Sequence, residues 1–273
     1  MTVIPPWHPH LDVWALVLVL GLGYWYANVR IRPHVAGGSS APTRRQWWQW
    51  YSALGLMWLV SDWPLHDIAE ESLFSVHMLE HMVLTFAVPP LLLMALPRWL
   101  ADATLGRTPQ VWVLRPLSRA VVAFVIFNTV FIAVHWPEAV NLMLTNDLAH
   151  FVIHLALFAS AVLMWMPVLS PTPAIPVLPR PMQMLYLFLQ SLLPTIPASF
   201  LTFSSSAIYP TYGDAASRWG LTAVTDQTIA GVLMKLGGGL LLWMTIAVIW
   251  FRWTADERDR EKTDISTQRV GQP

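Results

Sequence analysis

The feature of this sequence that most constrains its fold is an apolar stretch from residue 73 to residue 96. About 20 residues, each rising 1.5 Å along a helix, cover the ~30 Å hydrocarbon core of a bilayer, so this stretch can cross a membrane. Its first third contains His77, Glu80 and His81. Because ionisable groups are costly in lipid, these side chains are expected to face the protein interior and to mark a functional site.

Composition extends the membrane interpretation to the whole chain. Hydrophobic residues make up 55% and charged residues 12%, whereas about 25% of residues are charged in soluble domains. The sequence predicts an all-α, polytopic membrane protein with a seven-helix domain at residues 1–253 and a polar, partly disordered cytoplasmic tail at residues 254–273. The seven spans are expected at residues 12–29, 46–62, 73–96, 118–136, 148–168, 182–203 and 228–251.

Prolines and glycines predict two local features of these spans. Pro89 and Pro90 in the third span, and Pro194 and Pro197 in the sixth, remove backbone donors. Kinks are therefore expected there, with neighbouring helices satisfying the freed carbonyls. The glycines at residues 237–239 lie mid-span, where small residues allow helices to approach closely.

The distribution of basic residues predicts the orientation. All Lys and Arg residues except Arg218 and Lys235 fall in three loops or in the C-terminal tail. The positive-inside rule then places these segments in the cytoplasm and the N-terminus outside. Every histidine except His34 would lie in an outer segment or in the outer part of a span, so the predicted site opens to the outside. The basic segments are residues 30–45, 97–119, 169–181 and 252–273, and the histidines outside the two pairs described next are His8, His10, His66 and His135.

Two histidine pairs are the strongest functional signal. His77 and His81 in the third span, and His150 and His154 in the fifth, are each four residues apart and therefore share a helix face. The two spans run in the same direction and place the pairs at nearly equal height, so the four imidazoles are expected to converge. Such a site accepts copper or zinc, and nearby thioethers favour Cu(I). Further candidate ligands are His135, Met78 and Met82.

Other interpretations of these residues remain open at this stage. The segment from His77 to His81 matches H-x-x-E-H, in which Glu80 would be the general base of a membrane zinc hydrolase. The histidines could instead bind haem in an electron-transfer protein, although axial ligands must approach opposite faces of one haem. A copper transporter is poorly supported because the cytoplasmic half lacks matching histidines. Glu80 could also form a buried ion pair with Lys235, which lies at a similar depth.

Polar residues at two span ends have two interpretations of equal weight. Asp226 and Gln227, and likewise Asp62 and Trp63, could orient imidazoles of a metal site. They could equally be helix-end residues at the membrane interface. The chain has no cysteine and zero net charge, so disulfides and thiol ligands are excluded and no electrostatic case exists for nucleic acid.

Several of these residues give the chain a resemblance to a known family, the CtaG family of seven-helix cytochrome c oxidase assembly proteins. This is not the Cys-bearing, single-span copper chaperone of the same name. Glu80 departs from the family pattern, where Gln is common, and this weakens the hydrolase interpretation. The resemblance covers roughly residues 45–250 and rests on Pro64-Leu65, residues 73–78 with His81, residues 88–92, residues 135–137, His150-Phe151 with His154, residues 164–168, Asp226-Gln227, Ala230-Gly231 and Met234.

The resemblance implies a function. It implies a non-enzymatic assembly factor, multi-pass in a bacterial plasma membrane, that helps to mature the copper centre of cytochrome c oxidase through copper handling. The implied partners are the lipid bilayer, haem-copper oxidase subunits and periplasmic copper donors.

Overall fold

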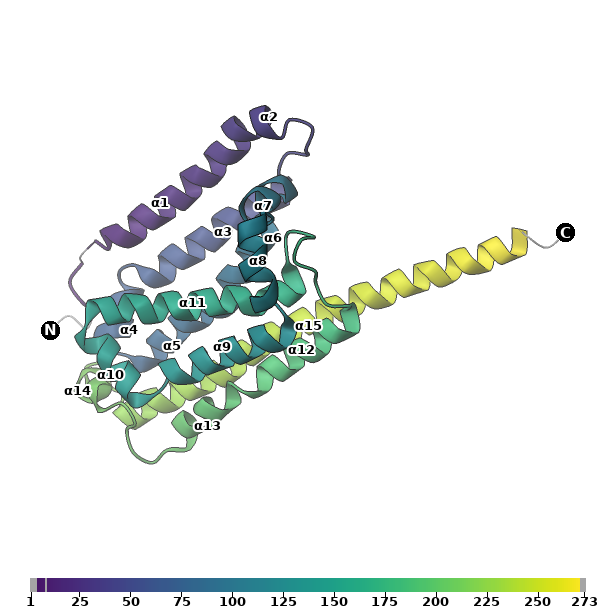
Figure 1. Ribbon diagram of the computed structural model, residues 1–273. Helices are drawn as coiled ribbons and strands as arrows, with labels where there is room; N and C mark the ends of the chain where they lie inside the picture. Colours follow the sequence, from purple (N-terminus) through teal and green to yellow (C-terminus); the bar gives the residue numbers. More distant parts are fainter. Residues whose placement is uncertain (1–3, 8, 271–273) are drawn as a thin grey trace.

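The computed structural model of the protein describes residues 4–7 and 9–270, and every regular element among them is helical (Figure 1). This confirms the predicted all-α class, while His8 lies outside the described residues. In chain order the elements are α1 (Leu11–Tyr26), the π-helical η1 (Ala27–Ile31), α2 (Arg32–Val35), α3 (Arg44–Ser61), α4 (Leu65–Glu71), α5 (Phe74–Met82), the π-helical η2 (Val83–Ala87), α6 (Val88–Ala95), α7 (Arg98–Thr104), α8 (Thr108–Leu117), α9 (Ala120–Val134), α10 (Pro137–Thr145), α11 (Asp147–Leu169), α12 (Arg180–Leu192), α13 (Thr195–Phe203), the 3-10 turn η3 (Pro210–Tyr212), α14 (Gly213–Ser217) and α15 (Ala223–Val270).

Five helical stretches in the described part of the chain are long and apolar enough to cross a membrane. A sixth is obtained if α8 and α9, which bend by 74° at their junction, form one span. Helix is present at all seven predicted ranges, but α3 at the second range is too polar to meet the same criterion. The count of seven spans therefore stays a prediction. The five stretches are Leu11–Val35, Phe74–Ala95, Asp147–Leu169, Arg180–Phe203 and Ala223–Thr263.

Both predicted proline distortions are present. Helix α12 ends at Leu192 and α13 begins at Thr195, so the sixth predicted span is interrupted at Pro194. In the third span, the π-helical turn η2 ends at Ala87, two residues before Pro89.

The prolines of the third span leave one backbone acceptor that a neighbouring helix satisfies. The Thr85 carbonyl would bond to the N–H of residue 89 in an α-helical turn, or of residue 90 in a π-helical turn, and both are prolines. The indole N–H of Trp165 in α11 donates to this carbonyl instead, at 3.1 Å. This hydrogen bond ties α11 to the helix that carries His77 and His81.

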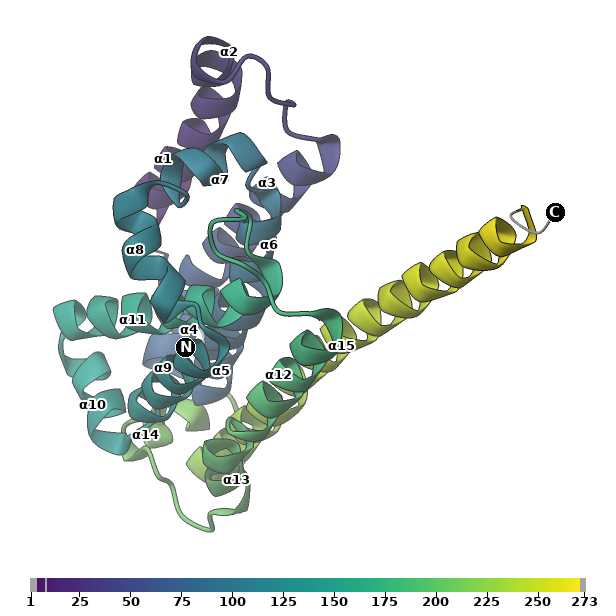
Figure 2. The ribbon, with the colours of Figure 1, turned by 45° about the vertical axis from the view of Figure 1, so that its right-hand side comes forward.

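Helix α15 is the longest element, with 48 residues, and packs against α5, α12 and α13. It continues as a helix through residues 254–270, for which the sequence predicts a partly disordered tail. Figures 1 and 2 show this part extending beyond the other helices. Exposed pairs three residues apart, Arg260–Glu257 at 3.6 Å and Lys262–Asp259 at 3.4 Å, are of the kind that stabilises a solvated helix.

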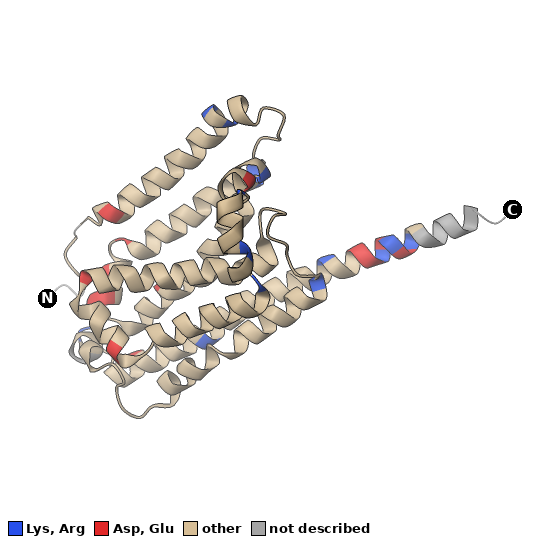
Figure 3. Cartoon of the chain, viewed as in Figure 1, with Lys and Arg blue, Asp and Glu red and all other residues tan. Residues whose placement is uncertain are grey.

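Charged residues are distributed unevenly along the bundle axis. Within the bundle, Figure 3 shows acidic residues mainly at the end that contains α4 and α10, and basic residues mainly at the opposite end, near α2, α7 and the exit of α15. The extended part of α15 carries both acidic and basic residues. The structure thus separates the charges spatially as the loop assignments from the sequence require.

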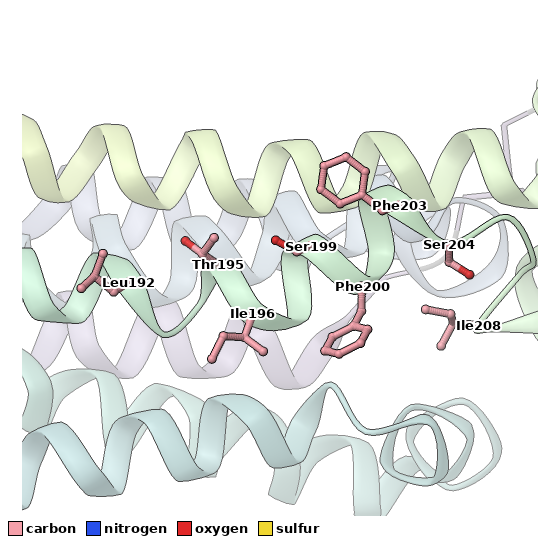
Figure 4. A pocket seen from close by; sticks show the side chains of 8 residues that line it. All are labelled: Leu192, Thr195, Ile196, Ser199, Phe200, Phe203, Ser204 and Ile208. Carbon is pink, nitrogen blue, oxygen red and sulfur yellow. The ribbon is translucent and has the colours of Figure 1, made fainter.

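The outer surface of the helices is largely apolar, as lipid contact requires. Phe200 and Phe203, for example, are 69% and 80% exposed. They help to line an open groove of about 640 Å³ along α12, α13 and the segment that follows (Figure 4). No histidine lines this groove. Its lining residues are Leu192, Thr195, Ile196, Ser199, Phe200, Phe203, Ser204 and Ile208.

Candidate metal centre

Helix α5, which carries His77 and His81, is fixed at its start by a residue from α15. The N-cap residue Leu73 has no side chain that can accept a hydrogen bond. The fully buried carboxylate of Asp226 accepts instead, from the backbone N–H groups of Phe74 at 2.7 Å and Ser75 at 3.2 Å. A carboxylate at a helix N-terminus stabilises the unpaired donors and the positive end of the helix dipole. Asp226 is therefore a helix cap, and Gln227 bonds to the backbone of Ile208, Leu201 and Ser206.

Three of the four paired histidines come together between α5 and α11. The Nε2 atoms of His81 and His154 are 3.2 Å apart. The ring of His77 lies 4.2 Å from that of His81 and 5.7 Å from that of His154, measured between centroids. One ring nitrogen from each of the three side chains can be chosen so that all lie within 4.8 Å of one another. We call His77, His81 and His154 the buried group.

The ring nitrogens of the buried group are poorly satisfied by the protein. His77 is 1% exposed, and neither of its ring nitrogens has a hydrogen-bond partner among the described residues. Nδ1 of His81 is also buried without a partner in that part of the chain. Buried polar atoms in native proteins are nearly always paired, so several unpaired imidazole nitrogens in one place indicate a missing partner. A metal ion would supply that partner.

The spacing of the buried group suits a small ion better than a haem. Two nitrogens that are each 2.0–2.1 Å from a tetrahedral metal are separated by about 3.3 Å, close to the observed 3.2 Å between His81 and His154. The centroids of these two rings are only 4.7 Å apart. A haem between them would require α5 and α11 to separate.

His135, at the end of α9, lies beside the buried group. Its Nδ1–H donates to the carbonyl of Phe131 at 2.6 Å, which leaves Nε2 as the nitrogen that can accept a metal. That nitrogen is buried and has no partner among the described residues, and the ring centroid lies 6.1 Å from that of His81. The hydroxyl of Tyr209 donates a hydrogen bond to the backbone carbonyl of His135 at 2.6 Å, which stabilises the end of α9.

The two predicted thioether ligands are buried, and one of them packs against another helix. Met78 is 2% exposed and belongs to the hydrophobic core. The methyl group of Met82 packs against Gly237 and Gly238 of α15. Because Met82 follows His81 directly, its side chain leaves the helix about 100° away from that histidine. The contacts of Met82 therefore favour a packing role.

His150 belongs to a different cluster, which the sequence did not reveal. Its Nε2 lies 2.9 Å from Oε1 of Glu70, and Nε2 of His66 lies 3.2 Å from the same oxygen. We call His66, Glu70 and His150 the rim group. Its ligand atoms also lie within 4.8 Å of one another. One sequence signal could have revealed this cluster. His66 and Glu70 are four residues apart, which places both side chains on one face of α4.

Glu80 pairs with His66, and the proposed pair with Lys235 is wrong. Both carboxylate oxygens of Glu80 lie 3.1 Å from Nδ1 of His66, whereas Lys235 is exposed on α15 and lines a small pocket beside Ser191 and Thr195. Similar depth did not bring the two together because Glu80 is rotated towards α3 and α4. The same rotation directs the carboxylate to His66, which weighs against a hydrolase in which Glu80 is the general base.

The acidic neighbours of His66 determine its protonation. Burial lowers the pKa of His66, but the hydrogen bond and charge of Glu80, with the charges of Glu70 and Asp67, outweigh burial and raise it to about 9. Burial also raises the pKa of Glu70, but the hydrogen bond from His150 and the charge of His66 bring it below its usual value. Without a metal, His66 is thus a cation between two carboxylates.

The side chains of Asp62 and Trp63 contact the N-terminal segment, while the backbone carbonyl of Asp62 accepts a hydrogen bond from the backbone N–H of His66 at 3.1 Å. Asp62 accepts a hydrogen bond from the indole of Trp14 at 2.8 Å. Trp63 donates its own indole N–H to the carbonyl of Pro5 at 3.1 Å. These bonds fasten α1 and the segment before it to the end of α3, so the side-chain contacts favour the helix-end interpretation of both residues.

Comparison with protein families identifies a family whose matched residues include both histidine groups. The family model of the cytochrome c oxidase caa3 assembly factor, Caa3_CtaG, matches residues 22–256. The chain belongs to the CtaG family. This confirms the resemblance inferred from the sequence, and the matched range contains the buried group, the rim group and His135. Comparisons with curated proteins and with solved structures find no match to this chain.

Membership of the CtaG family establishes the general role of the protein. The family is one of assembly factors for cytochrome c oxidase, so oxidase subunits are the implied partners. Its several apolar helices are those of a multi-pass membrane protein in a lipid environment.

Proposed function

We propose that this CtaG-family protein binds copper as Cu(I) through His77, His81 and His154, and that it assists maturation of the copper centre of cytochrome c oxidase. His135 is the further ligand in this proposal. The observation that carries it is the gathering of buried imidazole nitrogens that lack hydrogen-bond partners among the described residues. Imidazole suits both copper and zinc. Because the buried group contains no anionic ligand, a singly charged ion costs less to bury there than a doubly charged one.

The remaining residues of the site would act by holding the ligands in place. Asp226 fixes the start of α5, and Trp165 ties α11 to the same helical span one turn beyond His81. The Phe131 carbonyl fixes which nitrogen of His135 is free. Ligands that come from three helices and are held in this way are preorganised for one ion. The acceptor that follows from the family is an oxidase subunit, and a periplasmic copper donor is proposed as the source.

Copper content tests the metal assignment directly. The His77→Ala/His154→Ala double variant, purified in detergent after growth with copper, should contain at least one copper ion per chain less than the wild type. Removal of two of the three imidazoles leaves a single ligand in the buried group. Elemental analysis gives the copper number, and the exposed His34→Ala variant is the control. Equal copper in the wild type and the double variant would reject the site.

We further infer seven spans, with α3 as the additional one, the N-terminus outside and the C-terminus in the cytoplasm of a bacterial plasma membrane. The separation of charges along the bundle supports this orientation. Alkaline phosphatase, which is active only outside the cytoplasm, should be active when fused after Asn146 and inactive when fused after residue 273. The opposite pattern would invert the topology and turn the site towards the cytoplasm.

A further inference from the structure

The rim group has the composition of a copper site in its own right. A single oxygen of Glu70 lies within 3.2 Å of Nε2 of both His66 and His150. Imidazole nitrogens suit copper, and the carboxylate offsets the positive charge of the ion in a partly buried place. The rim group therefore combines imidazole donors, which suit copper, with the negative charge that the buried group lacks.

The orientation of His66 is that of a metal ligand. Its Nδ1 faces both oxygens of Glu80, a side chain that is only 2% exposed and also accepts a hydrogen bond from Ser61 at 3.4 Å. Metal-binding histidines almost always donate their second ring N–H to a carboxylate or carbonyl, and this fixes the ring and the tautomer. The contact with Glu80 leaves Nε2 directed at Glu70. Glu80 is in this arrangement a positioning residue for His66.

The two groups differ in their access to solvent. The side chains of His66, His150 and Glu70 are 14%, 16% and 33% exposed, whereas His77 and His81 are 1% and 3% exposed as residues. An ion that approaches from solution can therefore reach the rim group without any movement of the helices. Protein encloses His77 and His81 of the buried group, whereas its third member, His154, is partly exposed.

The rim group and the buried group are in direct contact through α11. The rings of His150 and His154, one helical turn apart, are stacked with centroids 4.2 Å apart. The His66 ring lies 5.6 Å from the His150 ring on one side, and His154 faces His81 on the other. The imidazoles thus form a continuous row from the rim group, through the partly exposed His154, to the buried His81 and His77.

We propose that His66, Glu70 and His150 form a second copper site, through which Cu(I) is loaded and then passed to the buried group. The transfer part rests on the proposed function of the buried group. It is a ligand exchange in which the bonds from copper to His66 and Glu70 break as bonds to His154 and His81 form. His150, which is next to both groups, holds the ion during the exchange. Binding of the ion at Nε2 of His66 releases the proton from that nitrogen to solvent, and the proton returns when the ion moves on. The ion keeps its charge, and no electron is transferred.

The test measures copper number and uptake rate on the full-length protein in detergent. The protein is stripped of metal and supplied with Cu(I) under nitrogen, from the coloured Cu(I) complex of bicinchoninate. The wild type should bind two ions per chain, and Glu70→Gln and His66→Gln one each. Uptake by these two variants should be slower, on the order of ten-fold, because the exposed ligands are lost. His77→Ala/His81→Ala should keep one rapidly bound ion, and His34→Ala should behave as the wild type.

The variants allow the rim site and the proposed function of the buried group to be rejected independently. If Glu70→Gln and His66→Gln match the wild type in number and rate while His77→Ala/His81→Ala loses copper, the rim site is wrong and the buried site stands. If His77→Ala/His81→Ala loses no copper, the proposed function fails and the transfer fails with it. Glu70→Asp keeps a carboxylate and should retain the second ion, whereas a purely structural role would make Gln, which matches Glu in shape, the better replacement. Retention of the second ion by Gln but not by Asp would reject the proposal.

Discussion

Alanine at His77, His81 or His154 should lower cytochrome c oxidase activity in cells grown at limiting copper, without lowering the amount of this protein in the membrane. The expected loss is on the order of ten-fold or more, since even the removal of a group that orients a metal ligand costs 10–100-fold in affinity or activity. The loss should shrink when copper is added to the medium, because mass action compensates for weaker binding.

The measurement is oxidase activity per amount of this protein in isolated membranes, determined by immunoblot. His34→Ala is the matched control, because it removes a histidine that is exposed and outside both groups. If all three buried variants retain full oxidase activity at limiting copper, copper handling by the buried group is not part of oxidase assembly. A loss of protein in step with activity would indicate a folding defect and would also contradict the prediction.

The second large effect is expected at Gly231, where α15 lies close against α13. A Cβ atom at this position would lie 2.5 Å from the Thr202 hydroxyl, 2.8 Å from the Ala198 carbonyl oxygen and 2.9 Å from the Thr202 nitrogen. Two of these atoms belong to the backbone, so the helices must separate to admit even a methyl group. Gly231→Ala should therefore destabilise the protein by about 1–3 kcal/mol, the usual cost of overpacking.

Gly239→Ala is the control on the same helix. A Cβ there meets nothing within 4 Å, so this change should be neutral or stabilising by about 0.5–1 kcal/mol through helix propensity. Thermal unfolding in detergent, followed by tryptophan fluorescence, compares the two variants. Equal midpoints for Gly231→Ala and Gly239→Ala would show that the close approach of α13 and α15 does not contribute to stability.

The features that the sequence predicted correctly are local ones. Apolar runs, i, i+4 histidine spacing and prolines act within one or two helical turns, so they indicate helices, shared helix faces and breaks without knowledge of the neighbours. The family motifs were equally readable, and the family comparison confirms them. The predicted meeting of His81 with His154 followed from counting residues, since the rise per residue sets the height of each side chain.

Only the tertiary structure decided which side chains at the same level along the bundle axis contact one another. Height follows from the number of residues, but the direction of a side chain around its helix axis depends on how the helices pack. This rotation turns Glu80 towards His66, leaves Lys235 on the exposed face of α15, and directs His150 to Glu70. The short helix α4, which supplies both His66 and Glu70, lies outside the predicted spans, so its position came only from the folded chain.

The glycines also show which features the sequence predicts and which the tertiary structure decides. The run at residues 237–239 predicted a close helix contact, and Gly238 does pack against Met82 and Phe86, but the tightest approach is at Gly231. A glycine in the sequence permits close packing. Whether another backbone occupies the space is decided by the placement of a helix that is distant in sequence, here α13, against α15.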